Sequence, residues 1–172
     1  MKRAFTLLEL IIVLSIVILL ATLSIPLLTI NPEDELRSCL ADLTHTCQLV
    51  QQQALTLGVN QTIVLATHSI TYPVGQRSFT QELPPSLCWG FLDQVNGPPA
   101  TPTSKIIQAV TFPAENNIAQ ITFYPNGAIS PGTAYIIDRD KRVMGAFACG
   151  VYPVSYIRRY LYKSHQWLPL GT

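Results

Sequence analysis

The chain has 172 residues, of which 48% are hydrophobic and only 12% charged, and its formal net charge at pH 7 is +1. A typical soluble domain is about 25% charged, and the near-neutral balance excludes a strongly basic or strongly acidic protein. Much of the apolar excess lies in the uncharged stretch 10–32. About 20 apolar helical residues span a hydrocarbon core of ~30 Å. The sequence therefore predicts a membrane-spanning helix and excludes an ordinary soluble enzyme.

The residues before the apolar stretch predict its orientation. Lys2 and Arg3 precede the stretch, so the N-terminus is expected in the cytoplasm and the rest of the chain outside. The stretch is longer than the apolar region of a secretory signal peptide, and no Ala-x-Ala cleavage site follows it. An uncleaved signal anchor is the simplest interpretation.

Glu9 argues against that interpretation. A carboxylate among apolar residues is costly unless it is paired, and an acid inside a membrane segment indicates a function. A cut between Ala4 and Phe5 would create an amine at Phe5. A neighbouring subunit, shifted along the helix axis, would present that amine to Glu9, which makes this segment a self-assembly device.

The segment 5–9, Phe-Thr-Leu-Leu-Glu, followed by an apolar helix, resembles the prepilin motif of type IV pilins and type II secretion pseudopilins. The resemblance implies that a prepilin peptidase cuts between Ala4 and Phe5 and methylates the new N-terminus, and that Glu9 guides assembly with other pilins or pseudopilins. The family usually has Gly where this chain has Ala4. The family also often has a proline near Pro26, where the helix loosens in the filament; a tolerated membrane-helix proline is the alternative.

A second helix is predicted over 31–58. Asn31 suits a helix cap, Pro32 suits the first helical position, and the acids that follow suit the positive end of the helix dipole. Apolar residues then recur at alternating spacings of four and three, which is typical of an amphipathic helix, and Gly58 suits its end. These residues are Leu36, Leu40, Leu43, Cys47, Val50, Ala54 and Leu57. The family resemblance implies that this helix continues the membrane helix as one rod.

The remainder of the chain, 59–172, is predicted to form a β-rich domain. Strands are expected at 61–67, 69–72, 106–112, 118–124, 133–138, 143–148 and 154–162, with a Pro- and Gly-rich loop at 83–104. The predicted fold class is α+β: a long N-terminal helix, with a membrane half (5–30) and an amphipathic half (31–58), packed on an antiparallel sheet. Residues 1–4 are the predicted leader.

The segments 121–127, 130–133 and 138–140 resemble the domain that GspH and FimT share. These are minor pseudopilins of type II secretion and minor pilins of type IV pili. The resemblance implies a minor pseudopilin that is processed by a prepilin peptidase, is anchored in the inner membrane with its domain in the periplasm, and takes a structural part in protein export. Two rivals are a DNA-binding minor pilin and a signal-anchored periplasmic enzyme.

Four cysteines are candidates for disulfides in an oxidising compartment: Cys39, Cys47, Cys88 and Cys149. Cys39 and Cys47 are eight residues apart on one helix, about 12 Å, which is too far for a bond between them. Three outcomes are left open. Cys39 pairs with Cys88 and Cys47 with Cys149, or Cys39 pairs with Cys149 and Cys47 with Cys88, or one bond forms. A core cysteine is also a small hydrophobe.

The C-terminal region carries basic and aromatic residues that are candidates for DNA binding. Arg158, Arg159 and Lys163 lie among tyrosines, and such a mixture holds nucleic acid by phosphate contacts and stacking. The resemblance to FimT-like pilins implies the same use. The favoured alternative is an edge strand that Lys and Arg protect from aggregation, because alternation places Arg158 and Arg159 on opposite faces.

No catalytic, metal-binding or cofactor-binding site is predicted. His45, His68 and His165 are scattered, without a nucleophile motif or the spacing of a zinc site. Asp138 and Asp140 offer too few oxygen ligands for a calcium loop and are interpreted as a solvated turn.

Overall fold

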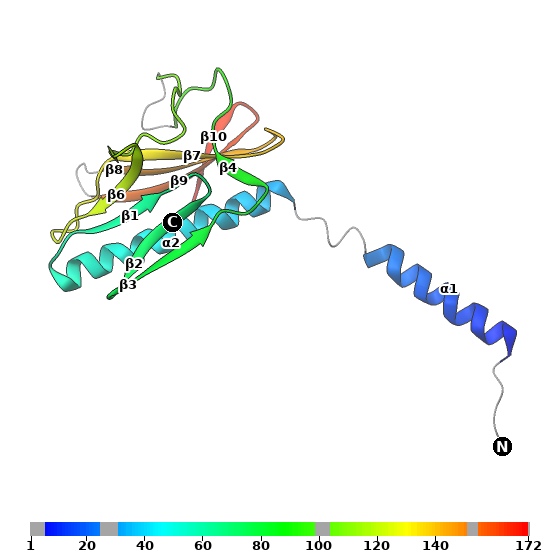
Figure 1. The fold of residues 1–172 in the computed structure, drawn as a ribbon. Helices are drawn as coiled ribbons and strands as arrows, with labels where there is room; N and C mark the ends of the chain where they lie inside the picture. Colours follow the sequence, from blue (N-terminus) through cyan, green and yellow to red (C-terminus); the bar gives the residue numbers. More distant parts are fainter. Residues whose placement is uncertain (1–5, 25–30, 99–103, 151–154, 172) are drawn as a thin grey trace. The chain divides into compact units, whose positions relative to one another are not determined.

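A computed structural model describes residues 6–24, 31–98, 104–150 and 155–171. The chain divides into two compact units, residues 1–31 and 32–172. The first unit contains helix α1 (Leu7–Ser24), and the second contains helix α2 (Pro32–Leu57) and the strands (Figure 1).

The second unit has two antiparallel sheets of five strands each. The strands are β1 (Gln61–Leu65), β2 (Ser69–Val74), β3 (Arg77–Glu82), β4 (Leu87–Trp89), β5 (Ala114–Glu115), β6 (Ile118–Phe123), β7 (Gly132–Asp138), β8 (Met144–Gly150), β9 (Tyr156–Lys163) and β10 (Gln166–Leu170). The first sheet has the order β3-β2-β1-β6-β5, and the second has the order β10-β9-β8-β7-β4. In the first sheet, β1 pairs over its whole length with β6, more than fifty residues later in the chain.

Local chemistry sets both ends of α2, and both predicted ends are confirmed. Pro32 occupies the first helical position, and Glu33, Asp34 and Glu35 follow in the first turn, where acids complement the helix dipole. At the other end Gly58 adopts a φ of 68°, and its backbone N–H donates to the Ala54 carbonyl at 3.0 Å. A left-handed glycine directly after the last helical residue is a common helix stop.

The core lies between α2 and the two sheets. The apolar face of α2 is buried as predicted, except at Leu57, which is 53% exposed. One core cluster joins this face to side chains from both sheets, including Ile63, Ile121 and Phe147. Figure 1 shows α2 running along the strands. The apolar face of α2 is therefore buried by side chains from both sheets together.

Strand β8 presents alternate residues to opposite sides, as strand geometry requires. Phe147 and Cys149 belong to the core that contains α2, whereas Ala146 and Ala148 belong to a smaller cluster on the outer side of the sheet. A Cβ added at Gly145 would lie 2.7 Å from Cδ1 of Leu40, so the absence of a side chain lets α2 approach this strand.

The predicted α+β fold with one long N-terminal helix is wrong. The described residues form two separate helices and a mostly β fold with two sheets. Helix α2 starts at Pro32 because proline has no N–H for a preceding turn and disfavours helix in the residue before it. Four strands lie outside the expected ones, namely β3, β4, β5 and β10; of these, β4 falls in the segment that was expected to be a loop. The strand expected at 106–112 is absent from these described residues.

The predicted transmembrane helix, and with it the single-pass inner-membrane location, is also wrong. No helix within the described residues has the length and apolar character needed to cross a membrane.

Candidate functional site

Helix α1 starts directly after the predicted cleavage site. The hydroxyl Oγ1 of Thr6 accepts a hydrogen bond from the backbone N–H of Glu9 at 3.3 Å, and the Thr6 carbonyl accepts from Leu10 N–H. Thr6 is therefore an N-cap, which satisfies one of the free donors of the first turn. Sequence reasoning missed this role, although Thr followed three residues later by Glu is the signature of a capping box.

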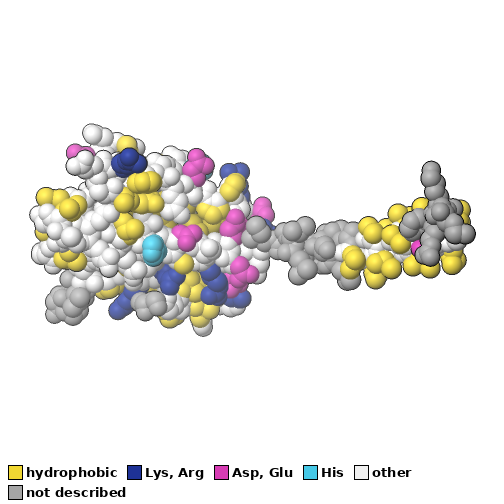
Figure 2. All heavy atoms as spheres, turned by 90° about the horizontal axis from the view of Figure 1, so that it is seen from below, with side chains coloured by type: hydrophobic (Ala, Val, Ile, Leu, Met, Phe, Trp, Pro, Cys, Tyr) yellow, Lys and Arg dark blue, Asp and Glu magenta, His cyan; other side chains and the backbone are white. Residues whose placement is uncertain are grey.

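The surface of α1 is apolar all round. Every Leu, Ile and Val side chain from Leu7 to Leu20 is more than half exposed, and Figure 2 shows hydrophobic side chains along this helix. Glu9 is the single charged residue of α1 and is itself exposed. Folded chains rarely leave so large an apolar surface uncovered. This surface is suited to association with other apolar helices.

Three predicted site residues lie outside the described residues. These are Ala4 and Phe5 at the predicted cleavage site, and Pro26 at the predicted helix kink. Their predicted roles stay predictions.

The basic residues of β9 do not form a common patch. The guanidinium of Arg158 lies 4.3 Å above the ring of Tyr156. Arg159 donates to the carbonyl of Gly171, and Nζ of Lys163 lies 2.9 Å from Oε2 of Glu33 in α2.

The faces of β9 explain this separation. Arg158 pairs across the strands with Ala148 of the outer cluster, and Arg159 pairs with Phe147 of the core that contains α2. Cross-strand partners share a face, so the two arginines point to opposite sides, as predicted. The edge-strand interpretation of β9 is wrong, because β10 lies outside it in the sheet.

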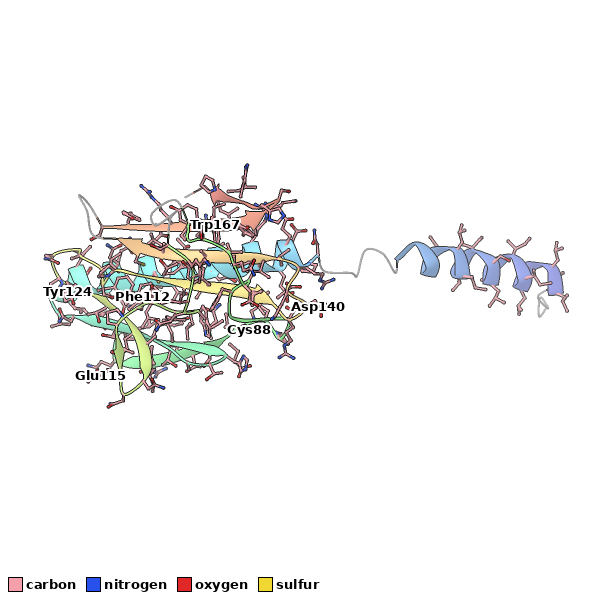
Figure 3. The ribbon with its side chains drawn as sticks, turned by 90° about the horizontal axis from the view of Figure 1, so that it is seen from above. Cys88, Phe112, Glu115, Tyr124, Asp140 and Trp167 are labelled. Atoms are coloured by element: carbon pink, nitrogen blue, oxygen red, sulfur yellow. The ribbon has the colours of Figure 1, made fainter. Side chains whose placement is uncertain are left out.

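The structure brings two of the four cysteines toward one another, and all four are free thiols. Cys47 in α2 and Cys149 in β8 are buried in the same core cluster, which also contains Cys39. Burial and the nearby Cys149 both raise the pKa of Cys47. Cys88 lies on the edge strand β4 (Figure 3), where its thiol is directed to the Ile137 carbonyl at 3.8 Å. Burial, with the nearby Asp42 and Glu35 carboxylates, raises the pKa of Cys39 to about 12.

Asp138 is a buried carboxylate that the sequence interpretation placed in a solvated turn. Its side chain is only 2% exposed. Oδ1 accepts from the backbone N–H groups of Arg142 and Val143 at 2.6 and 2.8 Å, and Oδ2 accepts from Nε of Arg142 at 3.1 Å. Asp140, in contrast, is exposed (Figure 3). Asp138 therefore closes the β7–β8 turn, and the solvated interpretation holds for Asp140 alone.

The acidic side of α2 carries a small hollow. It has a volume of 180 Å³, and its lining includes the acidic residues Glu35, Asp42 and Glu82 and the apolar residues Leu43 and Ile70. Pockets for drug-sized ligands usually have volumes of about 300–1,000 Å³. The hollow is therefore too small for a substrate of that size.

The histidines do not come together. His45 lies in α2, His68 precedes β2, and His165 lies between β9 and β10. Within the part of the chain that the structure describes, no three His, Cys, Asp or Glu side chains group as ligands for a metal ion.

Neither a family model, nor a curated protein, nor a solved structure matches this chain. The comparisons thus provide no family support for a pseudopilin or for secretion, and the resemblance rests on the sequence motifs alone.

Proposed function

We propose that the chain is a structural subunit of a filament of pilin-like subunits, with the role of a minor pseudopilin in type II protein secretion. A prepilin peptidase removes 1–4 and methylates Phe5, and the processed α1 then joins the corresponding helices of other subunits. The chain is a substrate of an enzyme and acts by assembly, without catalysis of its own.

The exposed apolar surface of α1, with Glu9 as its one charge, is the observation that carries this proposal. The N-cap at Thr6 supports it, because the helix begins next to the cut and Glu9 lies in its first turn. An amine at Phe5 of a neighbouring subunit supplies a cation for the Glu9 carboxylate. Desolvation between packed helices strengthens such a pair.

Processing is tested by the intact mass of the full chain, produced with and without a prepilin peptidase. We expect the peptidase to remove Met1 to Ala4 and to add one methyl group. A variant with Ala4→Gly, the residue that the family usually has, is expected to be processed at least as completely. An unchanged mass for both chains would contradict the proposal.

Assembly is tested with Glu9→Gln in the processed chain, which removes the charge and keeps the shape. We expect chemical cross-links between copies to fall about tenfold, because the amine of the neighbour loses its carboxylate. Glu115→Gln is the matched control, since Glu115 is an exposed acid on β5 (Figure 3). Equal cross-linking of the Glu9→Gln and Glu115→Gln variants would contradict the role of Glu9.

DNA binding by a type IV pilin is the alternative function, and the described contacts favour it less. Glu33 already neutralises Lys163, and Arg159 lies on the face of β9 opposite to Arg158. Salt-dependent binding of duplex DNA that is lost in Arg158→Ala would favour this alternative over the proposal.

A further inference from the structure

Helix α2 and strand β8 run side by side in the same direction. The first turn of α2 lies at the end of β9, because Glu33 pairs with Lys163 at 2.9 Å. The end of β9 lies at the start of β8, since Tyr162 pairs with Met144. Gly145, the residue after Met144, lies against Leu40, two helical turns beyond Glu33 on α2, and a Cβ there would also lie 3.4 Å from Leu36.

From that alignment, Cys47 and Cys149 fall opposite one another. Leu40 to Cys47 is seven residues, two helical turns on one face and about 10 Å along the axis. Gly145 to Cys149 is four residues on one face of the strand, about 13 Å. Cys47 is 2% exposed and Cys149 is 5% exposed, and both belong to the core cluster between α2 and the sheets.

Cys39 belongs to the same core cluster, but neither Cys39 nor Cys88 lies beside this pair. Cys39 lines the acidic hollow, about 12 Å along the axis from Cys47. Leu87 and Trp89 contact the core cluster, so Cys88 between them points to the other side of β4. In addition, Cys88 pairs with Ile137, and Ile137 pairs with Met144 at the start of β8. Cys88 is therefore at the far end of the domain from Cys47 and Cys149.

We infer that Cys47 and Cys149 form a buried disulfide between α2 and β8 when the chain folds with a disulfide oxidant such as oxidised glutathione, while Cys39 and Cys88 stay free. Of the pairings that the sequence left open, the structure supports only this one. The inference does not depend on the proposed function.

The bond forms by two thiol–disulfide exchanges. One thiolate attacks oxidised glutathione and releases one reduced glutathione; the second thiolate then attacks the mixed disulfide and releases another. The cysteines lose two protons and two electrons, and the oxidant gains the electrons. Burial raises the pKa values of both thiols, and the thiolate is the reactive form. The exchange therefore belongs to folding, before the core closes.

The bond would close a loop of about 100 residues, which is large enough for strong stabilisation of the folded state. We expect the midpoint of thermal unfolding to rise by on the order of 10 °C relative to the reduced chain.

The test refolds the reduced, urea-unfolded full chain in detergent with a glutathione redox buffer. Remaining thiols are alkylated under denaturing conditions and counted by intact mass, and circular dichroism checks the fold. We expect two alkylated cysteines and a mass lower by two hydrogens. Trypsin should yield a link between peptides 38–77 and 143–158. Because the first peptide contains two cysteines, the Cys39→Ser/Cys88→Ser variant identifies the partner: it should keep the link and take up no alkylating agent.

The control variants are Cys47→Ala and Cys149→Ala, which should each lose the link. Four alkylated cysteines in the folded wild-type chain would overturn the inference. Loss of the link in Cys39→Ser/Cys88→Ser, with its fold retained, would overturn it equally, because Cys39 or Cys88 would then be a bonding partner. The double variant keeps both core cysteines, so this test does not depend on whether the alanine variants fold.

Discussion

The two helices of this chain differ in how their surfaces are used. Helix α1 has apolar side chains on every side, and each described one is more than half exposed. Helix α2 has one apolar face, and Leu36, Leu40 and Val50 on that face are fully buried in its domain. Helix α2 thus buries its apolar face within its own domain, whereas the described apolar side chains of α1 are largely exposed.

The first turns of the helices show the same difference. Glu33 in α2 pairs with Arg37 at 2.8 Å and with Lys163 at 2.9 Å. For Glu9 in α1, no ion pair occurs among the described residues. An acid in a first turn is favourable in both helices because of the helix dipole. Within the described part of the chain, Glu33 therefore has counter-charges from its own domain and Glu9 has none.

The largest expected effect comes from truncating one leucine in each helix. Leu40→Ala should lower the free energy of unfolding by about 2–5 kcal/mol, because it leaves a cavity in the core. Leu14→Ala, at a side chain that is 56% exposed, should change it by less than about 0.5 kcal/mol. Urea unfolding followed by the fluorescence of Trp89 and Trp167 measures both. Equal losses would break the comparison, since α1 would then belong to the same core.

A smaller effect is expected where α2 meets β8. Gly145→Val should cost about 1–3 kcal/mol, because even a Cβ would lie 2.7 Å from Leu40 Cδ1 and 3.3 Å from the Tyr160 carbonyl oxygen. Gly171→Val is the control, since a Cβ there has no neighbour within 4 Å. The same unfolding experiment compares them. A Gly145→Val chain as stable as the control would mean that α2 does not need this close approach.

The smallest expected effect concerns the ion pairs of Glu33. Hydrogen bonds from Arg37 and then Lys163 hold the Glu33 pKa below its usual value of 4.5. The folded carboxyl therefore binds its proton less readily than the unfolded one, and its stabilising contribution is present above pH 4.5. That contribution is lost as the pH falls through the lower folded pKa.

Glu33→Gln should accordingly lower the free energy of unfolding at pH 7 by less than about 1 kcal/mol, because Arg37 and Lys163 are largely exposed and screened. The difference from the wild type should shrink as the pH falls below 4.5 or as salt is added. Glu9→Gln is the matched control and should leave domain stability unchanged at each pH. A pH-independent difference for Glu33→Gln would contradict the ion-pair explanation.

The ends and the apolar face of α2 could be predicted from the sequence, but the arrangement of the strands into two sheets could not be predicted. Pro32 and Gly58 act on their own neighbours, so the helix ends were predicted correctly. Strand β3 was not predicted, and the strand expected at 69–72 is longer in the structure. Strand β2 continues through Pro73 to Val74, and Gly75 begins a two-residue turn with a φ of 62°. The pairing of β2 with β1 ends at Thr71, so Pro73 pairs only with Ser78 of β3, and a proline is tolerated where no second strand needs its N–H.

In the candidate site, too, features set by neighbouring residues could be predicted and contacts between distant residues could not. The motif around Phe5 and Glu9 could be recognised because its residues are adjacent in the chain. The separation of Arg158 from Arg159 also followed from alternation. The pairing of Lys163 with Glu33 could not be predicted, because the two residues are 130 positions apart in the chain.

By itself, the sequence determined where α2 begins and ends and which of its faces is apolar, because these features depend on residues within a few turns of one another. Only the tertiary structure decided that the strands divide into two sheets, that Asp138 is buried while Asp140 is exposed, and that Cys149 faces Cys47. Each of these depends on which distant segments pair. Strand pairing is selected by the apolar surface that the whole chain buries. A local sequence pattern does not determine that quantity.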